Sequence, residues 1–174
     1  IRTVEPSWRM SQADVQALLE SELEAPGIAV VVPVHDPHPR HLALALNSLE
    51  SQLWPLVCIV LVDDGSENAQ VQEMLQTFAA RVTGVSLLRN KENLGLSNAL
   101  NCGLTSVDAR WVTFLDHDDL LPKDALARVA RAICRCPEDA LFYTDEDQIG
   151  LLGIRHSPFF KPQWDPLRFL GQNT

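Results

Sequence analysis

Long apolar runs and basic residues are what this sequence most clearly lacks. No stretch reaches the roughly 18 consecutive apolar residues that a membrane-spanning helix needs. Lysine and arginine together number 14 against 23 aspartates and glutamates, which gives a formal net charge of −9. Such an acidic chain is a poor ligand for polyanions, so nucleic acid is not expected as a partner.

Cysteine is also scarce, with four residues in the chain. Cys134 and Cys136 are closely spaced, but a structural zinc site would require a second pair of ligands. Scattered thiols without a disulfide framework are typical of a reducing compartment. We therefore expect a cytoplasmic protein.

The sequence does have enough apolar content for a globular core, because 46% of its 174 residues are hydrophobic. The chain begins with Ile1 rather than Met, and we expect it to be a piece of a longer polypeptide. A short amphipathic helix over about 11–24 predicts an N-terminal helical extension over residues 1–26. Residues 27–174 are then expected to form the main domain, truncated at its C-terminus.

Apolar runs of strand length alternate with helical patterns through this main domain. Strands are expected at 28–34, 57–62, 85–88, 111–115 and 140–143, and helices at about 42–53, 67–81 and 96–107. A further helix is expected with Pro122 in its first turn. After the strand at 140–143, the irregular segment that contains Gly150, Gly153, Pro158, Pro162 and Pro166 is expected to form a hairpin or loop excursion. This order predicts an α/β fold, a three-layer α/β/α sandwich around a mainly parallel sheet.

Polar residues gather directly after these expected strands. Because ligands bind at the carboxyl ends of the strands in such sheets, these segments form the candidate site. Most of them are rich in acid, and like charges on one edge repel one another, so a cation or a set of hydroxyl and N–H donors is expected there. The segments are His35–Asp36, Asp63–Ser66, Arg89–Lys91, Asp116–Asp119 and Thr144–Asp147.

Asp116 and Asp118 give the strongest signal. Residues two apart on an extended segment point the same way, so we expect both carboxylates to face one ion. Mg²⁺ or Mn²⁺ takes carboxylates together with phosphate oxygens and would neutralise charge on a departing diphosphate. The alternative is that these acids cap the helix expected near Pro122, a role that Asp119 in particular suits.

Two other strand ends fit a nucleotide. A carboxylate in Asp63–Asp64 can accept a ring N–H of uracil or thymine, and the ring of His35 can stack on a base or sugar. An ordinary surface or core histidine is the alternative for His35. The segment Asn93–Asn101 enters a helix whose first N–H groups can face an anion, or it forms a simple turn and polar helix face.

The order of these motifs resembles the nucleotide-sugar-binding half of family 2 glycosyltransferases, which have the GT-A fold. The resemblance covers roughly residues 27–174, and its motifs are Val32–Asp36, Asp63–Ser66, Asn93–Asn101 and Leu115–Asp119. It implies a metal-dependent, inverting enzyme that transfers a sugar from a UDP-, dTDP- or GDP-sugar to a polysaccharide or lipid-linked acceptor.

The resemblance also implies roles for single residues. Asp116 and Asp118 match the DxD pair that holds Mn²⁺ or Mg²⁺, with Asp118 as the expected direct ligand. Many relatives have Tyr where this chain has His35. The residues expected to bind the nucleotide sugar, from the resemblance together with the spaced set at the helix entry, are Pro33, His35, Asp64, Gly95, Asn98, Asn101 and Asp116.

Two later segments, Phe142–Asp147 and Phe159–Pro162, look like those of bacterial members that build cell-surface polysaccharide, generally at the cytoplasmic face of the membrane. Inverting relatives use a later Asp or Glu as the base that deprotonates the acceptor hydroxyl. We assign no catalytic base within the chain and expect it beyond Thr174.

Three alternatives stay open. A nucleotidyltransferase of similar topology needs a glycine-rich basic loop after the first strand, and residues 35–41 contain no glycine. A phosphoacceptor receiver domain needs a lysine where this chain has Asp145–Asp147. A non-catalytic module with a degenerate nucleotide site is the third.

Overall fold

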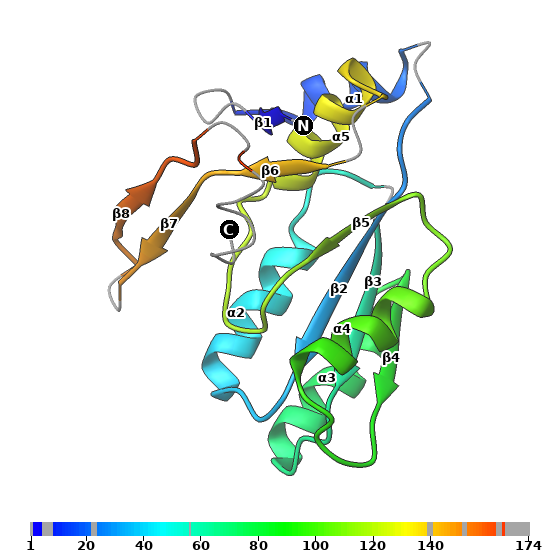
Figure 1. Ribbon diagram of the computed structural model, residues 1–174, viewed down its shortest axis with the longest axis vertical. Helices are drawn as coiled ribbons and strands as arrows, with labels where there is room; N and C mark the ends of the chain where they lie inside the picture. The colour runs from blue at the N-terminus through cyan, green and yellow to red at the C-terminus, as the bar shows by residue number, and fades with distance from the viewer. Residues whose placement is uncertain are drawn as a thin grey trace.

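A four-stranded parallel sheet forms the centre of the protein (Figure 1). The computed structural model describes residues 2–4, 9–21, 24–55, 57–138, 141–150, 153–162 and 165. The strand order is β4-β3-β2-β5, and the strands are β2 (Ile28–Val34), β3 (Val57–Asp63), β4 (Val85–Arg89) and β5 (Trp111–Phe114). Every residue of β2 is buried, because β2 has neighbours on both sides and helices on both faces, which explains its unbroken apolar run.

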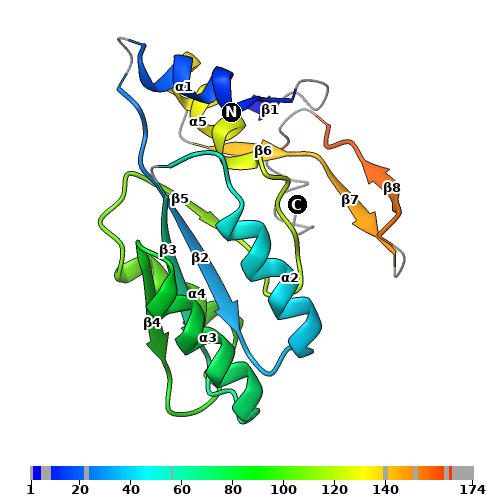
Figure 2. The same ribbon diagram turned by 180° about the vertical axis from the view of Figure 1, so that it is seen from behind.

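Helices cover both faces of this sheet, as the two opposite views show (Figures 1 and 2). Helices α2 (Pro39–Glu50) and α3 (Ala69–Arg81) pack on one set of alternate strand residues, where Leu42, Leu46 and Leu75 are buried. Helix α4 (Leu96–Thr105) packs on the other set, where Ala99 meets Val31, Val60 and Val62. The predicted three-layer α/β/α sandwich is therefore confirmed.

The remaining elements gather beyond the amino ends of the sheet strands and beside α2 (Figures 1 and 2). They are β1 (Arg2–Val4), α1 (Gln12–Leu19), α5 (Ala125–Arg135), β6 (Phe142–Thr144), and a hairpin of β7 (Glu146–Ile149) and β8 (Arg155–Phe159). A hairpin or loop excursion after the strand at 140–143 was expected, whereas β1 was not. Residues 1–26 thus contain a strand in addition to the predicted helix.

The pairing of β6 corrects one prediction. We expected a fifth strand of the main sheet over 140–143, but β6 pairs in parallel with β1 and forms a separate two-stranded sheet. A buried hydrogen bond of 2.9 Å from the Met10 N–H to the Asp124 carboxylate ties the N-terminal segment to the start of α5. β6 therefore lies with the N-terminal segment and not in the central sheet.

The start of α5 also differs from the prediction. Pro122 is not in the first turn of this helix, which begins at Ala125 with Asp124 at its N-cap position. Pro122 lies in the preceding turn, where its carbonyl accepts the Ala125 N–H at 2.9 Å. Asp119 does not cap α5 either, because it lies before that turn. Among the residues that the structure describes, no helix is long and apolar enough to cross a membrane.

Candidate functional site

The carboxyl ends of the four sheet strands lie side by side. In the parallel register Val34 is opposite Asp63, and Asp63 is opposite Arg89, while β5 runs along the other side of β2. The polar segments that follow β2, β3, β4 and β5 therefore meet at one edge, as predicted for the first four of the five. The fifth segment, Thr144–Asp147, follows a strand of a different sheet.

The turn after β3 is built around buried polar groups. Asp63 is 2% exposed, its Oδ1 accepts the Ser66 N–H at 2.9 Å, and its Oδ2 lies 3.4 Å from Arg89 Nε. Arg89 also donates to the Ser66 carbonyl at 3.2 Å. The guanidinium of Arg89 is thus engaged with a buried carboxylate and the turn, which stabilises the edge itself.

The Asp64 carboxylate holds the loop that leads into α4. It is 3% exposed and accepts hydrogen bonds from the Asn90 side chain at 2.6 Å and from the backbone N–H groups of Leu94 and Gly95, the latter at 2.9 Å. Burial by itself would raise the pKa of Asp64, but these three donors outweigh it and leave the pKa below its ordinary value. Asp64 is therefore ionised and already well supplied with donors from the protein.

Gly65 allows this arrangement. Its φ is 73°, and a Cβ built there would lie 2.5 Å from the backbone carbon of Glu92. The loop after β4 passes too close to this turn for any side chain, and an L residue is disfavoured at that φ. The sequence Asp63–Ser66 is thus a structural junction between β3 and the loop before α4.

The N-terminus of α4 is open to solvent. Gly95 occupies the N-cap position with φ 88°, and within the described residues no side chain caps the helix. Asn98 is exposed and donates back to the Leu94 carbonyl at 2.6 Å, and Asn101 is exposed one turn later. A helix start without a side-chain cap offers N–H groups and the positive end of the helix dipole to an anion.

The segment after β2 is joined to the β3 turn. Asp36 has a φ of 42°, and its carboxylate accepts the N–H groups of Glu67 at 3.1 Å and Asn68 at 2.9 Å, directly before α3. The hydrogen bond from Asn68, and after it the one from Glu67, holds the pKa of Asp36 below its ordinary value. His35 is exposed and its Nδ1 lies 3.0 Å from the Asp64 carbonyl, whereas Pro33 is buried.

The acid-rich segment after β5 is a turn and not a continuation of the strand. The strand ends at Phe114, residues 117 and 118 lie in a turn, and the Asp119 N–H donates to the Asp116 carbonyl at 3.1 Å. The expected extended segment from Asp116 to Asp118 is therefore not formed, and this spacing does not align the two side chains as it would on a strand. Both side chains are nevertheless exposed at the same edge.

Carboxylates crowd around Asp119. Its pKa is raised, first because its carboxyl group is partly withdrawn from water and then by the charges of Asp116, Asp118 and Glu146, with His117 acting in the opposite direction. Glu146 belongs to β7, so one acid of the predicted segment Thr144–Asp147 lies near this turn, although that segment follows a strand of a different sheet. These hard oxygen donors suit Mg²⁺ or Mn²⁺ chemically. In the described part of the chain, no three or more such side chains are already arranged as a metal-binding group.

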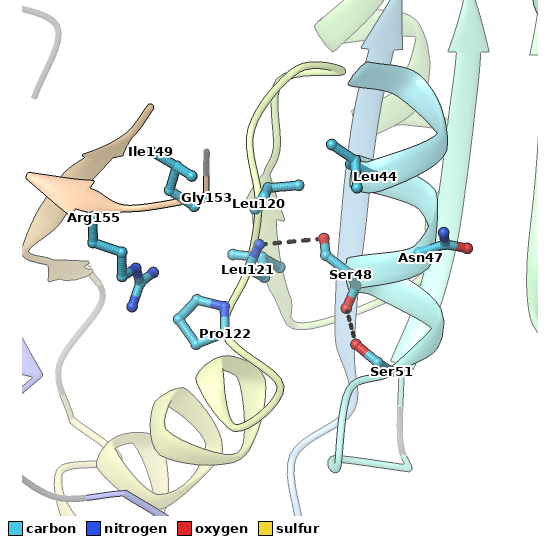
Figure 3. A pocket seen from close by; sticks show the side chains of 10 residues that line it. All are labelled: Leu44, Asn47, Ser48, Ser51, Leu120, Leu121, Pro122, Ile149, Gly153 and Arg155. Carbon is cyan, nitrogen blue, oxygen red and sulfur yellow. Dashed lines mark hydrogen bonds between the residues drawn. The ribbon is translucent and has the colours of Figure 1, made fainter. Parts of the chain in front are cut away.

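A hollow of about 520 Å³ lies beside this turn, between α2, residues 120–122 and the β7–β8 hairpin (Figure 3). Ser48 of α2 accepts the Leu121 N–H at 3.2 Å at its wall. No described residue of the lining carries a carboxylate, so the acid-rich turn is its neighbour and not part of it. The lining residues are Leu44, Asn47, Ser48, Ser51, Leu120, Leu121, Pro122, Ile149, Gly153 and Arg155.

The fold is that of the nucleotide-sugar glycosyltransferases. Residues 29–171 match the model of the family described as glycosyl transferase family 2, and the chain belongs to this family. The assignment agrees with the predicted resemblance and with neither the nucleotidyltransferase nor the receiver-domain alternative.

Two curated bacterial proteins are similar to this chain in sequence. The chain is 34% identical over 166 residues to the O-antigen biosynthesis protein RfbC of Myxococcus xanthus, covering 92% of this chain and 13% of that protein. It is 33% identical to glycosyltransferase GlyA of Streptococcus pneumoniae serotype 4, covering 64% of this chain and 16% of that protein. The chain therefore spans less than a fifth of the length of these two relatives.

Two solved structures share the fold. TarS 1–349 of S. aureus in complex with UDP-GlcNAc superimposes with a TM-score of 0.57 at 26% identity, over 61% of this chain and 30% of that one. The mannosyltransferase PcManGT of Pyrobaculum calidifontis, in complex with GDP-Man and Mn²⁺, has a TM-score of 0.57 at 21% identity, over 70% of this chain and 38% of that one. The predicted GT-A fold is thereby confirmed.

Asn90, His117 and Glu146 all lie in the predicted segments, but their contacts were not found from the sequence. These are the support of Asp64 by the Asn90 side chain, the carboxylate of Glu146 near Asp119, and the contact between His117 Nδ1 and the Pro33 carbonyl at 3.2 Å. Each joins segments that are far apart in the chain, so no local pattern marks it. The resemblance did include Asn93–Asn101, the segment whose backbone Asp64 holds.

Proposed function

We propose that this chain is the donor-binding part of a glycosyltransferase that uses a nucleotide-diphosphate sugar. The observation that carries the proposal is the meeting of three predicted features at one strand edge. These are the exposed ring of His35, the open N-terminus of α4, and the acids of the turn after β5. Each suits a different part of the donor, namely the base, the diphosphate and a cation bound to the diphosphate.

For the nucleotide, we propose the predicted roles of Pro33, His35 and Asp64. The His35 ring is exposed beside the end of β3, where a base can stack on it. A pyrimidine is supported by the UDP-GlcNAc bound to TarS, and a guanine nucleotide by the GDP-Man bound to PcManGT. Gly95, Asn98 and Asn101 would then border the diphosphate at the start of α4.

For the metal, we propose that Asp116 and Asp118 hold Mn²⁺ or Mg²⁺, with Asp118 as the direct ligand. The pKa of Asp119 is raised first by partial withdrawal of its carboxyl group from water and then by the charges of Asp116, Asp118 and Glu146, and a cation would offset these like charges. Water and phosphate oxygens would complete the coordination shell, as is usual for these hard ions. The ion would stabilise the negative charge of the departing diphosphate.

For the reaction as a whole, we propose inverting transfer to a polysaccharide or lipid-linked acceptor at the cytoplasmic face of the membrane. The similarity to an O-antigen biosynthesis protein supports a polysaccharide or lipid-linked acceptor. The four free cysteines support a reducing compartment. A later acid, beyond Thr174, would serve as the base. The small share of its relatives that this chain covers supports its being one part of a longer enzyme.

Calorimetric titration with UDP, dTDP and GDP, with and without Mn²⁺, tests the proposal. We expect one of the three to bind, more tightly with the ion. Asp118→Ala should abolish the metal-dependent part of the affinity, while the control Asp108→Ala, an exposed acid before β5, should not. No binding by any of the three at millimolar concentration would contradict donor binding.

A degenerate binding module would give a different pattern. It would bind a nucleotide, but the longer protein would neither hydrolyse nor transfer a nucleotide sugar. Release of UDP from UDP-GlcNAc by the longer protein therefore separates the enzyme from the module.

A further inference from the structure

His117 stands between the two proposed metal ligands, and its ring reaches the neighbouring strand. The residue is half-buried, and Nδ1 lies 3.2 Å from the carbonyl oxygen of Pro33. A carbonyl can only accept, so Nδ1 carries the proton of this hydrogen bond. The contact connects the turn that carries Asp116 and Asp118 to the strand end that carries His35.

The position of this bond follows from the ladder between β2 and β5. The Leu115 N–H donates to the Val31 carbonyl at 3.1 Å, which is the last backbone bond between the two segments. In a parallel ladder, alternate residues of one strand face the same neighbour, so residue 33 also faces the β5 side. The next ladder bond on that side would run from the backbone N–H of His117 to the Pro33 carbonyl.

Proline prevents the ladder from continuing in the usual way. Pro33 has no N–H to donate to the β5 segment, so pairing weakens at this point. The chain after Leu115 then leaves the strand and forms the turn closed by the Asp119 N–H and the Asp116 carbonyl. The Pro33 carbonyl would lack a partner on this side, and the His117 side chain supplies it in place of the His117 backbone.

We propose that His117 is a positioning residue for the donor site. Its side-chain hydrogen bond to the Pro33 carbonyl fixes the turn that carries the metal-binding acids relative to the strand end that carries the base pocket. The inference rests on the proposed function, because it presumes that nucleotide and metal bind at these two places. It assigns His117 no contact with donor or metal.

The test compares His117→Leu, which removes the donor group, with His117→Asn, whose amide N–H lies near the position of Nδ1. His41→Leu, at an exposed histidine of α2, is the control. Two quantities are measured on the 174-residue chain. One is amide hydrogen exchange at Asp119 without ligand, and the other is the affinity for UDP with and without Mn²⁺.

We expect His117→Leu to speed exchange at the Asp119 amide and to lose about tenfold in UDP affinity with Mn²⁺, equivalent to about 1.4 kcal/mol. Affinity for UDP alone should change by less than about threefold, because the base pocket itself remains. His117→Asn should restore both quantities toward the wild-type values, and His41→Leu should alter neither. If His117→Leu does not fold, His117→Gln is used in its place. The glutamine amide N–H lies one bond further from the backbone than Nδ1 of the histidine and so cannot replace it.

Wild-type behaviour of His117→Leu in both measurements would overturn the inference. Equal damage by His117→Asn and His117→Leu would also overturn it, because the hydrogen bond would not be the cause. If the wild-type chain binds no nucleotide at all, the proposed function fails. The exchange measurement then still decides whether His117 fixes the turn.

Discussion

The side-chain amide of Asn90 donates to Asp64 Oδ1 across 2.6 Å, so a residue after β4 supports a buried carboxylate after β3. The same carboxylate accepts the backbone N–H groups of Leu94 and Gly95, directly before α4. One ionised group thereby sets the position of the helix start that is proposed to meet the diphosphate. Asp64 has a structural task in addition to the nucleotide contact that we propose for it.

Asp64→Asn should destabilise the protein strongly. The amide that replaces one carboxylate oxygen would place a donor opposite backbone donors and remove the charge that strengthens these bonds. We expect a loss of about 3 kcal/mol in the free energy of unfolding, measured by urea denaturation. Asn90→Ala is the control: it removes one donor of three and should cost about 1 kcal/mol. Equal, small losses in the two variants would contradict this account.

Acid should weaken the same site. The pKa values of Asp64 and Asp36 lie below the ordinary value of 3.8 in the folded protein. Each carboxylate thus contributes stability that is present above about pH 4 and is lost as the pH falls through the lower folded value. Thermal midpoints between pH 6 and pH 2.5 should fall with acid, and less steeply in Asp64→Asn. An unchanged slope in that variant would show that Asp64 is not the titrating group.

The central sheet was predictable because its strands are marked by local sequence. Strands β2 and β3 are continuous apolar runs, and stripes such as Leu42 and Leu46 mark the helices between them. A parallel sheet places the residues after each strand at one edge, so His35, Asp64 and Asp116 could be grouped from the sequence alone. Periodicity and sheet topology were therefore sufficient to predict the central sheet and its edge.

The remaining features depend on contacts that the local sequence does not encode. β6 pairs with β1, whose three residues show no pattern of their own. Asp124 is turned toward the Met10 N–H instead of capping α5. The turn after β5 was missed because its cause lies on another strand, in the missing N–H of Pro33. Such partners, separated by many residues, become visible only in three dimensions.

Gly65→Ala tests the junction between β3 and the loop before α4. An added Cβ would lie 2.5 Å from backbone at Glu92, and the φ of 73° disfavours any L side chain. We expect a loss of at least about 2 kcal/mol in unfolding free energy. Gly27→Ala is the matched control, since its Cβ would meet nothing within 4 Å and its φ is not positive. Similar stability in the two variants would contradict the close approach.

Gly103→Ala tests how closely α4 lies on the sheet. A Cβ at residue 103 would be 2.3 Å from Val31 Cγ1, inside the core of that face. Overpacking of this kind costs about 1–3 kcal/mol, and Val31→Ala alone costs a comparable amount by leaving a cavity. In the double variant the new methyl group fills the space that Val31 vacates. We expect the combined loss to be at least about 1 kcal/mol smaller than the sum of the single losses. Simple additivity in chemical denaturation would contradict the contact.

Asp116→Asn tests whether the acids after β5 act on one another. The pKa of Asp119 is raised by partial withdrawal from water and then by Asp116, Asp118 and Glu146. Removal of the Asp116 charge should lower the pKa of Asp119 toward 3.8, which carboxyl NMR titration can follow. An acid with a raised folded pKa costs stability once it ionises, so the variant should be slightly more stable at neutral pH, by about 0.5 kcal/mol or less at this exposed site.

Added salt provides a control for the expected gain in stability of Asp116→Asn. Added salt should shrink the stability difference between Asp116→Asn and wild type, because it screens repulsion between exposed carboxylates. Asp108→Asn, at the opposite end of β5, should leave the Asp119 titration unchanged. If Asp119 titrated identically with and without the Asp116 charge, the acids would be independent, and repulsion at this turn would no longer support a cation there.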